Sequence, residues 1–157
     1  MVLSSYAKIN LNLKVNYRKK NNLHEIQSYF CLINLLDKIK IKKIKKRKDN
    51  IEFKGPFSRL VNKSNNSVLN LFRLLRKLKL ISSFYSVTVN KNIPVFAGLG
   101  GGTSNAASIL KYLFKKRLNK ILLTQVERRI GSDLQLFFYK QRIFKKFEND
   151  QKFKEKT

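Results

Sequence analysis

Residues 94–107 read PVFAGLGGGTSNAA and form the most glycine-rich part of this 157-residue chain. Four of its six glycines lie between Gly98 and Gly102, and small residues then lead into an apolar helical pattern. Glycine lets the backbone approach a ligand closely. A helix that begins after such a loop presents free N–H groups and a positive dipole end to an anion. The stretch therefore predicts a phosphate-binding loop; a plain tight turn, the alternative, needs fewer glycines and no hydroxyl pair after them.

Two common nucleotide-binding fingerprints do not fit this loop. No Gly-Lys-Ser/Thr ending is present, which excludes a Walker A loop, and no acidic residue follows about twenty positions later, as a Rossmann ribose contact requires. The class of phosphate-binding loop must therefore be identified from another sequence motif.

The loop resembles that of the GHMP kinases, which bind ATP through Pro-x-x-x-Gly-Leu-Gly-x-x-Ser-x-Ala-Ala. It is most similar to the branch that acts on a cytidine-diphosphate-linked methylerythritol in the non-mevalonate isoprenoid pathway. The resemblance implies ATP and Mg²⁺ as cofactors, with Ser104 or Thr103 able to meet the metal. Phe96 departs from the family, which has a small residue there, and so does Ala97 to a lesser degree. The implied ATP-binding residues are Pro94, Val95, Phe96, Ala97, Gly98, Leu99, Gly100, Gly101, Gly102, Thr103 and Ser104.

Residues 7–16 alternate between apolar and polar side chains, which predicts a half-buried strand. We expect the apolar face, Ala7 to Val15, to lie on the core; a merely solvated polar face is the plain alternative for Lys8 and its neighbours. The segment 7–11 resembles the first motif of the same kinase branch, with Tyr6 in place of the usual proline. The resemblance implies that Lys8 is catalytic and that Asn10 faces the substrate.

His24 is the only histidine and follows a predicted turn. A lone histidine is more often structural than a ligand, but His24-Glu25-Ile26 resembles the family's Gly-Tyr-His-Glu-Leu. The resemblance implies that His24 binds the cytosine base of the substrate. Leu23 replaces the tyrosine, so an aliphatic side chain stands where the family has an aromatic ring.

Residues 131–138, GSDLQLFF, resemble the family's Gly-Ala-Asp-Val-Pro-Phe-Phe, with Ser132 and Gln135 as departures. An aspartate after a helix end is usually a turn former. The resemblance instead implies that Asp133 is the catalytic base that takes the proton of the substrate hydroxyl. It also implies that Lys8 lies beside Asp133 and helps the hydroxyl lose that proton.

The remaining patterns predict a mixed set of strands and helices. We expect strands over 27–34 and 37–46 joined by a short turn, with a charged hairpin tip after them, then strands near 51–53 and 85–89. Helical spacing covers 68–78, with Asn66 or Ser67 as the N-cap. A capping box at 124–127 predicts the start of a helix that ends at Gly131.

The formal charge of +26 is extreme and by itself favours a nucleic-acid or anionic-surface binder. Lysines occur nearly everywhere, however, and Lys, Asn, Ile, Phe and Tyr are all residues of AT-rich codons, so mutational bias is the competing explanation. Cys31, the only cysteine, is expected to be a buried inert thiol, and it excludes an internal disulfide. No signal peptide or membrane span is apparent. We expect a cytoplasmic protein of an AT-rich bacterium or a plastid stroma.

The fold class implied by the resemblance is α/β (an α+β sandwich), namely the GHMP kinase N-terminal domain, which is ribosomal protein S5 domain 2-like. It would span residues 1–139, followed by a lysine-rich tail over 140–157, with the family's C-terminal domain absent. The implied function is ATP-dependent phosphorylation of the tertiary hydroxyl of the cytidine-diphosphate methylerythritol. A second polypeptide supplying the missing domain, a non-catalytic remnant and a basic RNA-binding domain of ribosomal type remain alternatives.

Overall fold

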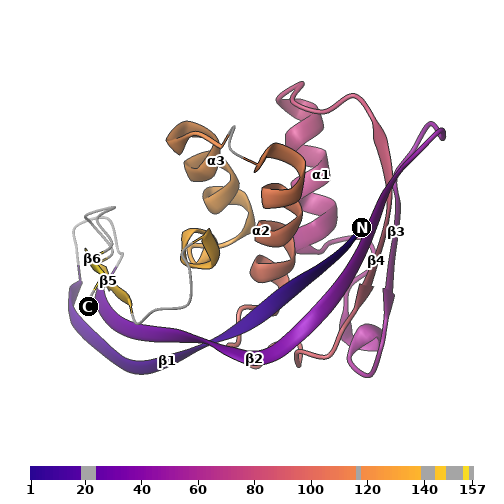
Figure 1. Cartoon of the computed structure of the whole chain (residues 1–157). Helices are drawn as coiled ribbons and strands as arrows, with labels where there is room; N and C mark the ends of the chain where they lie inside the picture. The colour runs from indigo at the N-terminus through magenta and orange to yellow at the C-terminus, as the bar shows by residue number, and fades with distance from the viewer. Residues whose placement is uncertain (19–23, 116–117, 139–143, 148–153, 156–157) are drawn as a thin grey trace.

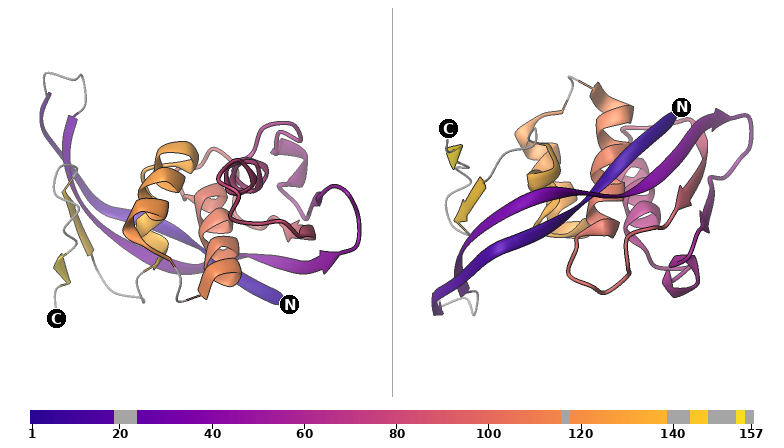
Figure 2. Two further views of the ribbon diagram at one scale, coloured as in Figure 1. Left: turned by 90° about the horizontal axis from the view of Figure 1, so that it is seen from above. Right: turned by 60° about the horizontal axis from the view of Figure 1, so that its bottom comes forward.

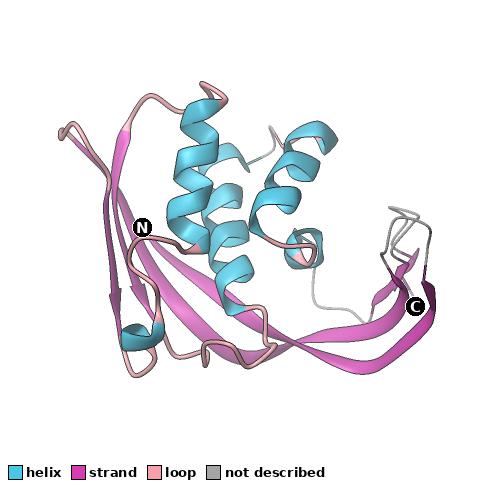
Figure 3. Cartoon of the chain, turned by 180° about the vertical axis from the view of Figure 1, so that it is seen from behind, coloured by secondary structure: helices cyan, strands magenta, loops and turns pink. Residues whose placement is uncertain are grey.

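The computed structural model describes residues 1–18, 24–115, 118–138, 144–147 and 154–155. In this part of the chain a curved β-sheet carries α-helices on one of its faces, while the other face is open (Figures 1 and 3). The mixed α/β arrangement predicted from the sequence is confirmed.

The sheet is organised around β2 (His24–Ile44), which pairs antiparallel with β1 (Val2–Arg18), with β4 (Phe84–Asn90) and with β5 (Phe144–Phe147). β3 (Asn50–Lys54) lies parallel to β4, and β6 (Lys154–Glu155) pairs with β5. The paired arm of β1 and β2 extends beyond the helices, and β5 and β6 lie along that extension (Figure 2). Part of the predicted lysine-rich tail is therefore added to the sheet.

β2 is continuous, so the prediction of two strands separated by a turn is wrong. Its register against β1 gives the reason: Tyr6 lies opposite Leu36, but Ala7 lies opposite Ile33. The residues between Ile33 and Leu36 are taken up as an irregularity in the ladder, which bends the strand without ending it. The charged residues that follow, 45–48, are exposed at the bend between β2 and β3, as predicted.

α1 (Ser67–Lys77) begins at Asn66, whose side chain accepts a hydrogen bond from Leu69 N at 2.9 Å. Of the two predicted N-caps, Asn66 is the one used. α2 (Gly101–Phe114) follows the glycine loop directly. The described part of the chain also contains the short 3₁₀ helices η1 (Ser58–Leu60) and η3 (Leu134–Phe138).

α3 (Lys120–Ile130) begins earlier than predicted. Asn119 is its N-cap and accepts a hydrogen bond from Leu122 N at 2.8 Å. Thr124 lies inside the helix, where its hydroxyl donates to Lys120 O at 3.0 Å. The prediction of a capping box at Thr124 is therefore wrong: the Thr124 hydroxyl bonds to a carbonyl of the preceding helical turn and does not cap the start of the helix. The predicted end at Gly131 is confirmed.

The core lies between the sheet and the helices. It is formed by buried apolar residues of β2, β4, α1, α2 and α3, together with η3: Ile39, Ile41, Val87, Val89, Val68, Leu71, Phe72, Leu75, Ala106, Ala107, Ile109, Leu110, Leu122, Val126, Leu134 and Phe137. Among the described helices, none is long and apolar enough to cross a membrane.

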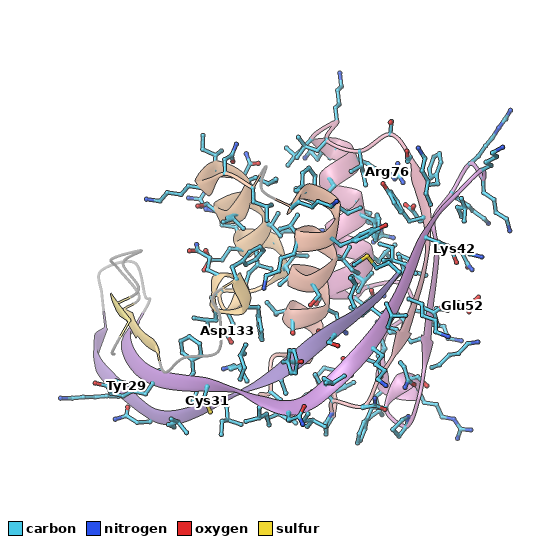
Figure 4. The ribbon with its side chains drawn as sticks, in the orientation of Figure 1. Tyr29, Cys31, Lys42, Glu52, Arg76 and Asp133 are labelled. Carbon is cyan, nitrogen blue, oxygen red and sulfur yellow. The ribbon has the colours of Figure 1, made fainter. Side chains whose placement is uncertain are left out.

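The burial predictions for Leu11 in β1 and Cys31 in β2 are wrong. Leu11, expected on the core, is 53% exposed. Lys8, predicted on the polar face and in the active site, is 5% exposed. Leu11 falls at a second irregularity of the ladder, between Asn10 and Asn12, where β1 has one residue more than β2, and such a bulge redirects a side chain. Cys31 is partly exposed and lies on the sheet face away from the helices (Figure 4).

Candidate active site

The glycine loop connects β4 to α2 and uses left-handed backbone conformations. Phe96, Gly98 and Gly100 have φ angles of 64°, 72° and 67°. Gly100 is the N-cap of α2, and no side chain caps the helix. The N–H groups of the first helical turn have no acceptors four residues back. They therefore leave an uncapped, positive helix end available to an anion.

Each of the three consecutive glycines has a close neighbour in the space where a Cβ would lie. At Gly100 that position is 2.9 Å from Phe137 Cζ and 3.2 Å from Lys8 Cγ. At Gly102 it is 2.8 Å from Ser67 Oγ, the first residue of α1. The glycines thus allow α2 to begin in close contact with three other elements, in addition to leaving its amides accessible.

A cavity of about 350 Å³ lies beside the loop. The loop residues 94–102 form one wall, and residues between Leu60 and Val68 form the other, including the start of α1. Lys91 and Asn105 also line it. A volume of this size falls at the lower end of small-molecule sites. The predicted ATP-binding loop therefore forms one wall of a cavity.

Lys8 and Asp133 converge beside this loop. Lys8 Nζ lies 3.2 Å from Asp133 Oδ2 and donates a hydrogen bond to Asn10 Oδ1 at 3.1 Å. The Lys8 side chain is 7% exposed and the Asp133 side chain 32%. Asp133 extends toward the sheet from the turn between α3 and η3 (Figure 4). The prediction that their charged groups lie within about one hydrogen bond of each other is confirmed.

Gly100 connects the ion pair to the cavity. Lys8 N donates a hydrogen bond to Leu99 O at 2.9 Å, and the Lys8 side chain packs beside Gly100. Neither Lys8 nor Asp133 lines the 350 Å³ cavity itself. Lys8 therefore contacts two residues of the loop, Leu99 and Gly100, that do line the cavity.

Ser104 and Thr103, the predicted Mg²⁺ ligands, point in different directions. Ser104 is 1% exposed, and its hydroxyl accepts a hydrogen bond from Ser5 Oγ at 2.8 Å. Thr103 lines the cavity. Across the described residues, no group of three or more His, Cys, Asp or Glu side chains is placed to hold a metal ion.

Lys111 fixes η3 against α2. Its ammonium group donates to Phe137 O and lies 5.2 Å from the centre of the Phe138 ring. Desolvation lowers the pKa of Lys111 below its usual value. This contact helps to hold the segment that carries Asp133.

His24 opens β2 opposite Arg18. The His24 side chain and residue Leu23 lie outside the described part of the structure. The predicted contact of His24 with a cytosine base therefore stays a prediction, whereas Asn10 is placed within the Lys8 and Asp133 cluster.

The sequence analysis missed a buried ion pair between Asp37 and Lys91. Lys91 Nζ lies 2.5 Å from Asp37 Oδ2, and the two side chains are 4% and 0% exposed. It also missed Asn105, which is 1% exposed and whose Oδ1 has no hydrogen-bond partner among the described residues. The composition does not single out Lys91 in a lysine-rich sequence; the one signal available was Asp37, an acidic residue between the apolar Leu36 and the alternating segment 38–44.

Comparisons with known proteins agree with this geometry. The GHMP kinases N terminal domain matches residues 66–139. The chain is 39% identical to the 4-diphosphocytidyl-2-C-methyl-D-erythritol kinase of Pelagibacter ubique over 136 residues, which cover 84% of this chain and 48% of that protein. It is 34% identical to the kinase of the same name from Ureaplasma parvum over 147 residues, 87% of this chain and 52% of that protein.

Solved structures give the same result. The crystal structure of a 4-(cytidine 5'-diphospho)-2C-methyl-D-erythritol kinase superposes with a TM-score of 0.73 at 25% identity, covering 99% of this chain and 55% of that one. A mevalonate kinase superposes with a TM-score of 0.66 at 15% identity, covering 100% of this chain and 56% of that one, and supports the fold alone. The chain spans about half the length of the curated relatives it matches.

Proposed function

Because the chain belongs to the GHMP kinase family, we propose that it is the nucleotide-binding half of a small-molecule kinase. The proposed reaction transfers the terminal phosphoryl group of ATP to the tertiary hydroxyl of 4-diphosphocytidyl-2-C-methyl-D-erythritol, in the supply of isoprenoid precursors. The observation that carries this proposal is the contact between Lys8 and Asp133 directly beside Gly100 of the loop.

The loop and its cavity support ATP binding. The uncapped start of α2 offers backbone N–H groups to phosphate oxygens, and at Gly98 no atom lies within 4 Å of the position of a Cβ. The cavity between the loop and residues 60–68 is available to the rest of the nucleotide. When bound, ATP supplies the phosphoryl group; the loop orients it and neutralises part of its charge.

The ion pair supports the acceptor half of the reaction. The Asp133 carboxylate is one-third exposed, so a substrate hydroxyl can reach it and transfer its proton to Oδ1 or Oδ2. The Lys8 ammonium is nearly buried, and it attracts both the carboxylate and the oxygen that loses the proton. Asn10, bonded to Lys8, is exposed and is proposed to contact the substrate, as is His24.

Mg²⁺ is proposed as the counter-ion of the phosphates. Mg²⁺ in nucleotide sites is usually held by the phosphates and waters, with only one or two protein ligands, so a cluster of acidic residues is not required. Thr103 lines the cavity, but its hydroxyl lies beside Gly131, 3.0 Å from the position a Cβ would take there, and would have to turn toward the phosphates. The Ser104 hydroxyl is bonded to Ser5 and would likewise have to turn away from it.

The missing half of the relatives is proposed to come from a further polypeptide segment or a separate chain. A second cavity, of about 710 Å³, is lined by residues at the start of β1, by α2 and by η3, and the neighbouring Met1 and Val2 are 73% and 58% exposed. Apolar surface of this kind is usually covered by a partner. A non-catalytic remnant is the alternative, but the retained contact between Lys8 and Asp133 favours an active site.

RNA binding is the second candidate function, and one observation favours it. Lys38, Lys40 and Lys42 alternate along β2 on the open face of the sheet, and all three are exposed. Lys42 and Glu52 lie on this face, away from the helices (Figure 4). Such a row of lysines attracts the phosphates of a nucleic acid and does not recognise its base sequence.

A direct assay tests the proposed kinase activity. The purified chain is incubated with ATP, Mg²⁺ and 4-diphosphocytidyl-2-C-methyl-D-erythritol, alone and with the C-terminal half of the Pelagibacter ubique relative. Phosphorylated substrate in either reaction, lost in Asp133→Asn, supports the proposal. ATP binding without turnover in both reactions would instead favour the remnant.

A further inference from the structure

An ion pair that the proposed reaction does not use lies beneath the glycine loop. Asp37 comes from β2, and Lys91 follows the last residue of β4. The Asp37 carboxylate is fully buried and accepts three hydrogen bonds: from Lys91 Nζ at 2.5 Å, from Asn92 N at 2.7 Å and from Ile93 N at 2.9 Å. One carboxylate therefore fixes three successive residues at the entrance to the loop.

The backbone of Lys91 is fixed from the other side as well. Lys91 N donates to Lys54 O at 2.7 Å, at the end of β3, and Lys91 O accepts from Phe57 N at 3.3 Å. Asn92 Nδ2 donates to Leu36 O at 3.2 Å. The chain thus leaves the sheet at one defined position and direction before it enters the loop.

The loop returns directly onto this anchored segment. A Cβ on Gly101 would lie 2.9 Å from Ile93 Cγ2 and 3.0 Å from Lys91 Nζ. The first residue of α2 therefore rests on Lys91 and Ile93. Asn105, one turn later in α2, lines the same cavity as Lys91. Lys91 therefore contacts the start of α2 and also lines the cavity.

A buried ion pair is a weak source of stability, because desolvation of the two charges offsets their attraction. Its charges also cancel, so the pair adds little net positive charge for a phosphate. The contacts around Asp37 and Lys91 instead fix the position of the backbone at residues 91–93. The position of the uncapped helix start depends on them.

We propose that Asp37 and Lys91 are positioning residues of the nucleotide site, which hold residues 91–93 so that α2 begins at Gly101 with its amides directed at the bound phosphates. The inference rests on the proposed nucleotide binding of the loop. Neither residue is assigned a chemical role. Lys91 acts through Gly101, and Asp37 acts through Lys91 and Ile93.

The double variant Asp37→Asn with Lys91→Met tests this inference. It removes both charges while keeping the side-chain shapes, which avoids leaving one buried charge unpaired. The matched control is Arg76→Met. Arg76 forms a different ion pair, to Asp49 at 2.8 Å, at the end of α1 and away from the loop.

Two measurements separate positioning from general stability. In the free protein, hydrogen–deuterium exchange of the peptide covering residues 94–104 should become at least about tenfold faster in the double variant and stay within about twofold in Arg76→Met. In calorimetric titration with ADP, the Kd should rise at least about tenfold in the double variant only.

The outcomes distinguish this inference from the proposed function. Exchange and ADP affinity that match the Arg76→Met control would overturn the positioning role. If the wild-type chain binds no ADP, the proposed nucleotide site fails. The exchange measurement on the free protein still decides whether Asp37 and Lys91 order the loop.

Discussion

Lys8 Nζ and Asp133 Oδ2 lie 3.2 Å apart, although one residue is near the start of β1 and the other follows α3. The two residues are far apart in the sequence, and only the packing of the helices on the sheet brings them together. Their contact depends on Gly100, beside which Lys8 packs, and on η3, whose Phe137 fills the space next to the same glycine. The two charged residues therefore meet only in the folded domain.

Asp133→Asn should remove phosphoryl transfer while leaving nucleotide affinity nearly unchanged. The carboxylate is placed for the acceptor hydroxyl and does not line the loop cavity. Loss of a general base lowers turnover by roughly 10²–10⁴-fold. Turnover is measured with the chain completed by a C-terminal half, and affinity by titration with ADP. Glu127→Gln, an acidic residue of α3 that contacts Gln135, is the control that should retain turnover; equal losses in both variants would contradict the role of Asp133.

Gly101→Val should abolish nucleotide binding. Its Cβ would lie 2.9 Å from Ile93 and 3.0 Å from Lys91 Nζ, so the first turn of α2 must shift. Gly102→Val should act in the same way through Ser67, at 2.8 Å. Titration calorimetry with ATP measures the loss, and circular dichroism checks that the variants are folded. Unchanged affinity in both folded variants would show that ATP does not bind at this loop.

The sequence could predict the loop, the strand that carries Lys8 and the turn that carries Asp133, because each is a compact motif with a distinctive composition. It could not predict which side of β1 is buried. That depends on the irregularity between Asn10 and Asn12, where Leu11 is the extra residue of β1, and such a bulge redirects a side chain of the strand.

The choice of helix cap and the long-range polar contacts could not be predicted from the sequence either. Thr124 and Asn119 are both acceptable helix caps, and only the structure shows that Asn119 is used. Asp37 is in β2 and Lys91 follows the end of β4, and no spacing rule relates them. In a chain with 35 lysines and arginines, nothing in the composition distinguishes Lys91 as a buried residue.

RNA should bind the chain weakly and without sequence preference, through the open sheet face. Because phosphate contacts release counterions, affinity should fall steeply with salt, by about 10³-fold or more between 50 and 200 mM if six or more phosphates are contacted. Replacing Lys38, Lys40 and Lys42 with Gln should reduce the salt slope by about three contacts. Filter binding with two unrelated RNAs measures this. Nanomolar affinity for one of them at physiological salt would favour a ribosomal-type function.

Phe96→Gly should strengthen nucleotide binding and stabilise the fold. Phe96 is 93% exposed and has a φ of 64°, so its side chain gains no packing while its backbone occupies a region that favours glycine. Relief of that strain is worth about 1 kcal/mol, which is several-fold in affinity if the loop must hold this conformation to bind. Lys79→Gly is the matched control, since Lys79 has a φ of 56° just beyond α1. Both variants should raise the midpoint of thermal unfolding, but only Phe96→Gly should lower the Kd for ADP; a lower Kd in both would show that the gain is one of general stability.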